Sequence, residues 1–332
     1  MPSRSLLFAC LGILLLGLAA ASVRLRLTSL PVGEEATHLL MAQSLWQDHN
    51  LRYEQRDLSR AHRVWSGGPL GLTLLTADGG RSLRYAEPLA YALAAAPFYG
   101  LLGAAGLPIL NMALFLAMVA AAAATFKDVP ALLLGGFFFA SASFGYVFRA
   151  SPEVFLMACL FFALLLWRSG RLAAAGALLG AACLHQPALA LLGAAVAIDL
   201  GLRSRWKGAA LMVVSGALVF GVLAAGQRRL TGVWNPSNPP AGVQRRTFES
   251  EIPLETAQDL WQAYGKEGGA GVDLSEGIRW LPRNLGYLLA GRHAGLLPYF
   301  PFGLLVVVLF GLGPRDRSAW LLSAALLLIL LL

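Results

Sequence analysis

Residues 106–125 read GLPILNMALFLAMVAAAAAT, a run without a single charged side chain. A helix needs about 20 consecutive apolar residues to cross the hydrocarbon core of a bilayer. Similar runs recur along the 332-residue chain, which is 57% hydrophobic and only 13% charged. This composition excludes an ordinary soluble globular protein. The sequence therefore predicts an all-α integral membrane protein.

The other apolar runs lie on both sides of this segment, at residues 5–22, 88–104, 129–147, 153–167, 172–184, 187–201, 208–226, 296–312 and 318–332. Run 5–22 resembles a signal peptide, but the many later runs favour a first helix that is retained as a membrane anchor, with Arg4 in the cytoplasm. If every run crossed, the basic clusters WRSGR (167–171) and RSRWK (203–207) would lie outside. That would violate the preference of Lys and Arg for short cytoplasmic loops.

Run 88–104 is the best candidate for a segment that does not cross. Pro88 and Pro97 interrupt it, and its aromatic side chains suit the interface between membrane and water. With this run along the outer surface, about nine transmembrane helices remain, and the short basic loops become cytoplasmic. We therefore predict one transmembrane domain over residues 1–332.

Four segments are external in this arrangement: residues 28–105, 148–152, 185–186 and 227–295. The first and last are long loops, and the first is expected to carry peripheral helices. The formal net charge of +8 is then explained by cytoplasmic loops, so we expect no nucleic-acid partner. Pro187 also breaks the short runs 172–184 and 187–201, which predicts a water-filled cavity near His185 and Gln186.

Two adjacent carboxylates, Glu34 and Glu35, open the stretch EEATHLLMAQSLW in the first external loop. One interpretation is that they are helix-start charges that interact with the helix dipole. The other is that a carboxylate held where membrane meets water acts as a general base. Glu153 has the same two interpretations, because it follows Pro152, opens an apolar run and lies near Arg149 on the same predicted side.

Several motifs in this order resemble the GT-C glycosyltransferases that use polyprenyl-phosphate sugars, a group that includes protein O-mannosyltransferases and lipid A aminoarabinose transferases. GEEATHLLMAQSLWQDHNL looks like the family's acidic loop and helix, and EPLAYAL like its peripheral helix. SPEVFLMACLFFALLLWR resembles the second acidic motif, and GAACLHQPALALL the broken helix pair. AGQRRLTGVWNP and GRHAGLLPYFP are similar to later motifs.

The resemblance implies a GT-C-like fold and assigns roles by position. It makes Glu34 the counterpart of the catalytic Asp, Glu35 its acidic neighbour and Glu153 the second-loop carboxylate. This chain departs from the family in two ways: Glu stands in place of Asp, and the basic residue that usually follows the acidic pair is missing. His38 stands near that position and is a candidate replacement, as a phosphate or metal contact.

Transfer of a sugar from a polyprenyl phosphate requires an acceptor base and cations for the departing phosphate. Glu34 would be the base, and Glu153 would orient the acceptor or the base. The candidate substrate-binding residues are His38, Arg52, Arg56, Arg84, Arg149, His185, Arg228, Arg229, Arg292 and His293. Each arginine has the alternative of a charge at the headgroup boundary, and His185 that of satisfying the helix break.

No motif demands a metal or other cofactor, although carboxylates and a lipid phosphate together are compatible with Mg²⁺ or Mn²⁺. The expected partners are a polyprenyl-phosphate sugar, a lipid, glycan or protein acceptor, and membrane lipids. The expected location is the bacterial cytoplasmic membrane, with the site facing outward. A transporter or flippase, or a noncatalytic protein that binds a lipid carrier, is the alternative. Members of the resembled family commonly continue beyond the position that corresponds to residue 332, so the sequence is also compatible with a fragment of a longer protein.

Overall fold

The computed structural model describes residues 31–65, 67–139, 142–249 and 317–331, with a few isolated positions outside these ranges. The structure is 70% helix with few strands, as the apolar runs predict in coarse form. The predicted spans 5–22 and 296–312 lie outside the described ranges, apart from isolated positions in the first. The nine-span GT-C arrangement therefore stays a prediction.

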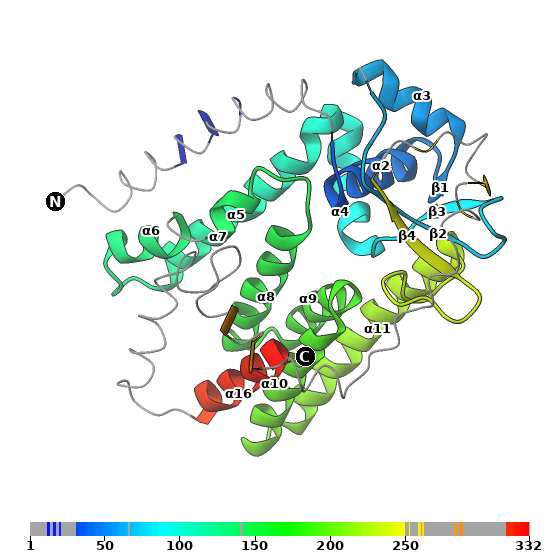
Figure 1. The fold of residues 1–332 in the computed structure, drawn as a ribbon. Helices are drawn as coiled ribbons and strands as arrows, with labels where there is room; N and C mark the ends of the chain where they lie inside the picture. The colour runs from blue at the N-terminus through cyan, green and yellow to red at the C-terminus, as the bar shows by residue number, and fades with distance from the viewer. Residues whose placement is uncertain are drawn as a thin grey trace.

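Figure 1 shows the elements in chain order. The helices are α2 (Glu34–Gln47), α3 (Gln55–Val64), α4 (Leu89–Leu102), η1 (Gly103–Ala105), α5 (Gly106–Thr125), α6 (Ala131–Phe139), α7 (Ala142–Tyr146), α8 (Glu153–Arg168), α9 (Leu172–His185), η2 (Pro187–Leu189), α10 (Ala190–Leu202), α11 (Trp206–Thr231) and α16 (Arg317–Leu331). The strands are β1 (Arg52–Tyr53), β2 (Leu72–Thr76), β3 (Leu83–Tyr85) and β4 (Gln244–Phe248).

Among the described residues, two helical segments are long and apolar enough to cross a membrane: Leu89–Thr125, which joins α4, η1 and α5, and α11. The first is not one straight helix. Gly103 has a φ of 61°, and a Cβ on Gly106 would lie 2.3 Å from the carbonyl oxygen of Phe98. This sharp bend separates α4 from α5, and α5 alone is about 30 Å long. Whether α4 lies along the interface stays a prediction.

Helices α9 and α11 pack closely because glycines line their contact. A Cβ on Gly180 would lie 2.2 Å from the carbonyl oxygen of Gly216, and one on Gly176 would lie 2.0 Å from that of Met212. Small residues spaced four apart allow helix backbones to approach within a membrane. On its other side α11 exposes apolar side chains, including Val214 and Leu218, as expected of a surface that faces lipid.

A four-stranded antiparallel sheet with the order β1-β3-β2-β4 is the main departure from the all-α prediction. Strands β2 and β3 form a hairpin whose turn carries Gly79 and Gly80 at positive φ. The Asp78 carboxylate accepts hydrogen bonds from the Thr76 and Ser82 hydroxyls and closes that turn. The sequence TADGGR between two apolar stretches is a hairpin signal that the expectation of helices overlooked.

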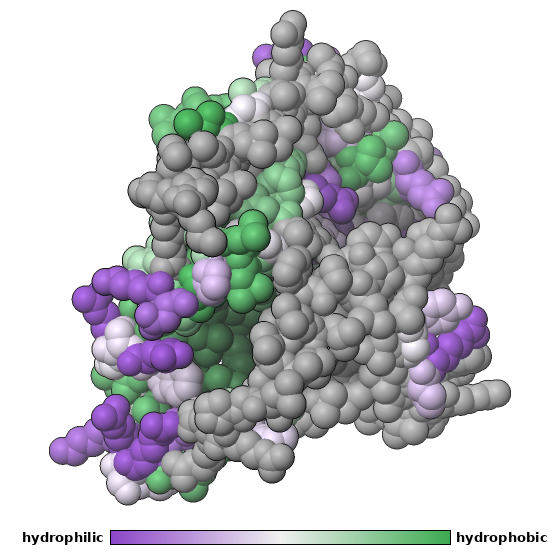
Figure 2. All heavy atoms as spheres, turned by 90° about the vertical axis from the view of Figure 1, so that its left-hand side faces the viewer, coloured by the Kyte–Doolittle hydropathy of each residue, from purple (hydrophilic) through white to green (hydrophobic). Residues whose placement is uncertain are grey.

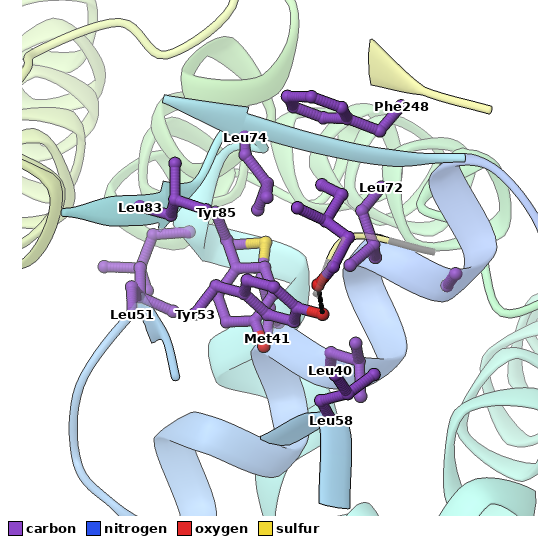
Figure 3. Close-up of a cluster of buried hydrophobic side chains, with 14 of the residues drawn as sticks. Leu40, Met41, Leu51, Tyr53, Leu58, Leu72, Leu74, Leu83, Tyr85 and Phe248 are labelled. Carbon is purple, nitrogen blue, oxygen red and sulfur yellow. Dashed lines mark hydrogen bonds between the residues drawn. The ribbon is translucent and has the colours of Figure 1, made fainter. Parts of the chain in front are cut away.

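The sheet packs on α2 and α3 through a cluster of buried side chains (Figure 3). Leu40 and Met41 of α2 face Leu72 and Leu74 of β2, and Tyr85 of β3 is fully buried among them. The cluster holds α2 against the sheet. It thereby sets the direction in which the helix presents its first turn.

Several segments that are distant in sequence meet at one end of the helical assembly. Two N–H groups in the first turn of α4, which have no acceptor within the helix, donate to side chains of other helices. Leu89 N–H donates to the Gln227 side chain at 2.6 Å, and Tyr91 N–H donates to His185 Nε2 at 2.9 Å. Glu35 and Arg149 join α2 to the loop before α8. The start of α2, the start of α4, loop 148–152, the break after α9 and the end of α11 are therefore neighbours. Which side of a membrane they face stays a prediction.

Candidate functional site

The two adjacent carboxylates differ in environment because α2 begins at Glu34. Val32 bridges to Leu70, and the backbone at Gly33 lies so close to Gly71 that a Cβ there would approach Gly33 N to 2.6 Å. This crossing sets the start of the helix. Successive helical residues then point about 100° apart, so Glu34 is exposed while Glu35 is half-buried.

Glu35 holds the loop before α8. Its Oε1 accepts a hydrogen bond from Arg149 Nε at 2.7 Å, and the Ala150 N–H lies 3.5 Å from Oε2. Asn111, which is fully buried on α5, fixes the same loop by donating to the carbonyls of Arg149 and Ser151 at 2.8 and 3.0 Å. The carboxylate raises the pKa of Arg149 further above its ordinary value. The guanidinium is therefore permanently positive, yet half of its side chain faces outward.

Glu153 is the first residue of α8 and lies near enough to Arg149 to interact with its charge. Its Oε2 is buried and has no hydrogen-bond partner within the described part of the chain. Arg149 therefore lies between two carboxylates, one from α2 and one from α8. The structure thus brings together Glu35, Arg149 and Glu153, three of the residues that the sequence singled out.

Glu87, which the sequence analysis did not single out, forms a second carboxylate–guanidinium pair. It lies just before α4 and contacts Arg245 of β4 at 3.0 Å. Burial raises the pKa of Glu87 to about 7, although the guanidinium of Arg245 lowers it and the charge of Glu34 raises it. Glu34 and Glu87 are therefore close enough to influence each other. The signal in the sequence was a lone glutamate in EPLAYAL, which is a weak one without its partner on a distant strand.

His38 does not supply the positive charge expected of it. Its ring is 1% exposed and lies edge-on to Tyr91 with centroids 5.3 Å apart. Burial, aided by the nearby His185, lowers the pKa of His38 to about 3, so the ring is neutral at physiological pH. His185 itself satisfies the N-terminus of α4. The two histidine rings lie close together, with their centroids 6.2 Å apart.

The remaining predicted cations are spread over other places. Arg56 pairs with Asp48 at 3.0 Å and with Glu54 at 2.6 Å, next to Arg52 on the outer edge of the sheet. Arg84 lies against Gly232 at the end of α11. Two more cations are exposed on the last turn of that helix: Arg228, which stacks over Trp234 at 4.8 Å, and Arg229. Arg292 and His293 lie outside the described residues.

The described residues contain no group of three or more His, Cys, Asp or Glu side chains placed to hold a metal ion. The site is therefore a set of carboxylates and arginines at one end of an apolar helical assembly. Such a set can exchange a proton and can hold a phosphate, because guanidinium groups match phosphate geometry. No protein-family model, curated protein or solved structure matches this chain.

Proposed function

We propose that the chain is a membrane glycosyltransferase that moves a sugar from a polyprenyl phosphate to an acceptor, with Glu34 as the general base. The observation that carries this proposal is one exposed carboxylate beside two carboxylate–guanidinium pairs, all at the same end of an apolar helical assembly. A lipid-linked donor would place its phosphate and anomeric carbon at this level and its hydrocarbon chain along the helices.

Glu34 is suited to the base because its carboxylate is exposed and has no ion pair with the described residues. It would take the proton of the acceptor hydroxyl as that oxygen attacks the anomeric carbon. Glu87, which has a pKa of about 7 and interacts with Glu34, can share that proton at neutral pH. Glu35 is already engaged with Arg149 and would act as a positioning residue.

The departing phosphate needs positive charge aimed at it. Arg149 lies in the loop before α8, and Arg245 lies on β4. Each guanidinium is oriented by a carboxylate at about 3 Å. This oriented pair takes the place of the basic residue that the first loop lacks. Glu153, with one buried oxygen that has no hydrogen-bond partner within the described residues, is placed to bind an acceptor hydroxyl.

A transporter is the less favoured alternative because coupling residues of transporters lie near the bilayer midplane. Here α5 carries no charged side chain, and α11 carries none between residues 208 and 227. The carboxylates gather instead at the helix ends. A protein that only binds the lipid carrier would use the same arginines, so an activity assay separates it from an enzyme.

The test is transfer of a labelled sugar from polyprenyl phosphate by the full chain in lipid nanodiscs. Glu34→Gln should reduce the rate by at least about 10²-fold with donor binding largely intact, since it removes a general base. Glu35→Gln, one residue away, is the matched control and should reduce it less. Full activity of a folded Glu34→Gln variant would place the base elsewhere. If Glu153→Gln were also fully active, the carboxylate mechanism would be wrong, and no transfer by the wild type would favour carrier binding.

A further inference from the structure

A second polar site lies at the opposite end of the helices, away from the carboxylates. Helix α8 ends there at Arg168, α10 ends at Leu202, and α11 begins at Trp206. An open cavity of about 370 Å³ lies among these ends and the start of α16. The polar side chains that line it are those of Trp167, Arg168, Asp199, Arg203, Arg205 and Ser318. Figure 2 shows hydrophilic side chains gathered toward the lower end of the molecule, beside a band of hydrophobic ones.

One of the three arginines is held rigidly by a buried carboxylate. Asp199 is 2% exposed, and its Oδ2 lies 2.9 Å from Arg203 Nε. The Ser318 hydroxyl donates to Asp199 Oδ1 at 2.9 Å and accepts a hydrogen bond from Arg203. A buried carboxylate is costly unless it is paired in this way. The network joins α10 to α16 and orients the guanidinium of Arg203 at the cavity.

The other two arginines leave the cavity positively charged. Arg168 and Arg205 are exposed and make no ion pair with the described residues, so the described lining of the cavity holds three guanidinium groups and one carboxylate. Arg168 also belongs to the last turn of α8, where the helix dipole favours a cation. Two excess positive charges on planar, forked donors are complementary to a phosphate group.

Exposed apolar side chains next to the lining residues indicate that the phosphate arrives on a lipid. Leu202, Trp206 and Trp320, each adjacent in sequence to a residue that lines the cavity, are 55%, 69% and 52% exposed. Tryptophan at a helix end is typical of the headgroup level of a membrane, and basic pockets between membrane helices bind anionic headgroups. We propose that this cavity binds the phosphate of an anionic phospholipid. The proposal does not depend on the sugar-transfer activity.

The test compares two double variants of the full chain in nanodiscs of phosphatidylcholine that contain increasing phosphatidylglycerol. Arg168→Gln/Arg205→Gln removes both unpaired cations from the cavity. Arg171→Gln/Lys207→Gln removes the same charge from the same end of the molecule, but outside the cavity lining. All four side chains are exposed, so neither variant disturbs buried packing. Bound phosphatidylglycerol is counted by native mass spectrometry.

Each cation near a membrane surface contributes about fivefold to anionic-lipid binding. The cavity variant should therefore bind phosphatidylglycerol about 25-fold more weakly. The control should lose much less at about 0.15 M salt, because neither of its side chains lines the cavity and salt screens attraction between exposed charges that are not in contact. Equal losses in the two variants would mean diffuse surface attraction and would overturn the proposal, as would no loss in the cavity variant.

Inorganic phosphate, added to the wild type in the same nanodiscs, separates the two sources of the ligand. Failure to displace bound phosphatidylglycerol assigns the cavity to the lipid headgroup, as proposed. Displacement that is lost in the cavity variant but kept in the control assigns the cavity to the phosphate group from either source, which overturns the restriction to lipid.

Discussion

Glu87 is the residue whose substitution best tests the electrostatics of the site. In the folded chain, burial raises the pKa of this carboxyl from the ordinary value of 4.5 to about 7, even with Arg245 at 3.0 Å. The folded pKa lies above the unfolded one, so the ionised group opposes folding. That cost is absent below about pH 4.5 and fully present above about pH 7.

The size of the effect follows from the two pKa values. A difference from 4.5 to about 7 corresponds to about 3 kcal/mol of unfolding free energy. Asp57, with a pKa raised to about 6, also makes the folded chain less stable as the pH rises. His38, with a pKa lowered to about 3, has the opposite effect, because the folded chain loses stability as the pH falls below the ordinary histidine pKa of 6.5. Because both are common to wild type and variant, the comparison isolates Glu87.

Relative to the wild type, Glu87→Gln should therefore gain less than about 1 kcal/mol of stability at pH 5 and up to about 3 kcal/mol at pH 8. The measurement is denaturant unfolding of the full chain in mild detergent at both values of pH. Glu249→Gln, at the exposed end of β4, is the control and should change little at either pH. If the Glu87→Gln and wild-type curves moved in parallel between pH 5 and 8, the buried, neutral-pH titration of Glu87 would be refuted.

Three other outcomes can be checked separately. Gly180→Ala should destabilise the chain by about 1–3 kcal/mol in thermal unfolding, because its methyl would meet an α11 carbonyl at 2.2 Å, while Gly193→Ala, whose methyl would have 3.8 Å, should be tolerated. Asn111→Leu should lower stability by about 1–3 kcal/mol and increase proteolysis of loop 148–152, which loses both hydrogen bonds from Asn111; unchanged cleavage would contradict this role. Single cysteines at Ser169 and Ser237 should react with an impermeant reagent from the cytoplasmic and external sides respectively, and labelling of Ser169→Cys only from outside would reverse the topology.

Much of the helical framework could be predicted from local pattern alone. The apolar run at 106–125 became α5, and the break at Pro187 became a 3₁₀ turn between α9 and α10. The proline-interrupted run 88–104 became a separate helix from α5. These features depend on the length of apolar runs and on proline geometry, which a single stretch of sequence contains.

The sheet could not be recognised in the same way. Strand β2 pairs with β4, which lies far away in the chain, and all five residues of β2 are buried, so they show no alternation of polar and apolar side chains. In a chain dominated by apolar helices, a short apolar stretch of this kind cannot be distinguished from a buried helix segment by its periodicity. The turn TADGGR marks the β2–β3 hairpin locally, but the pairing of β2 with β4 is decided only by the folded chain.

The candidate site shows the same difference between what local sequence indicates and what non-local contacts decide. The sequence alone marked Glu34, Glu35 and Glu153 as carboxylates at the ends of predicted helices, because charge is rare in so apolar a chain. It could not show that Glu35 binds Arg149 or that Glu87 pairs with Arg245, because each contact joins segments more than a hundred residues apart. Pairing and burial set the protonation state of a carboxyl or imidazole group, and both are properties of the folded chain. Sequence therefore determined which groups are present at this end of the helices, and tertiary structure decided which of them are paired, buried or exposed to a substrate.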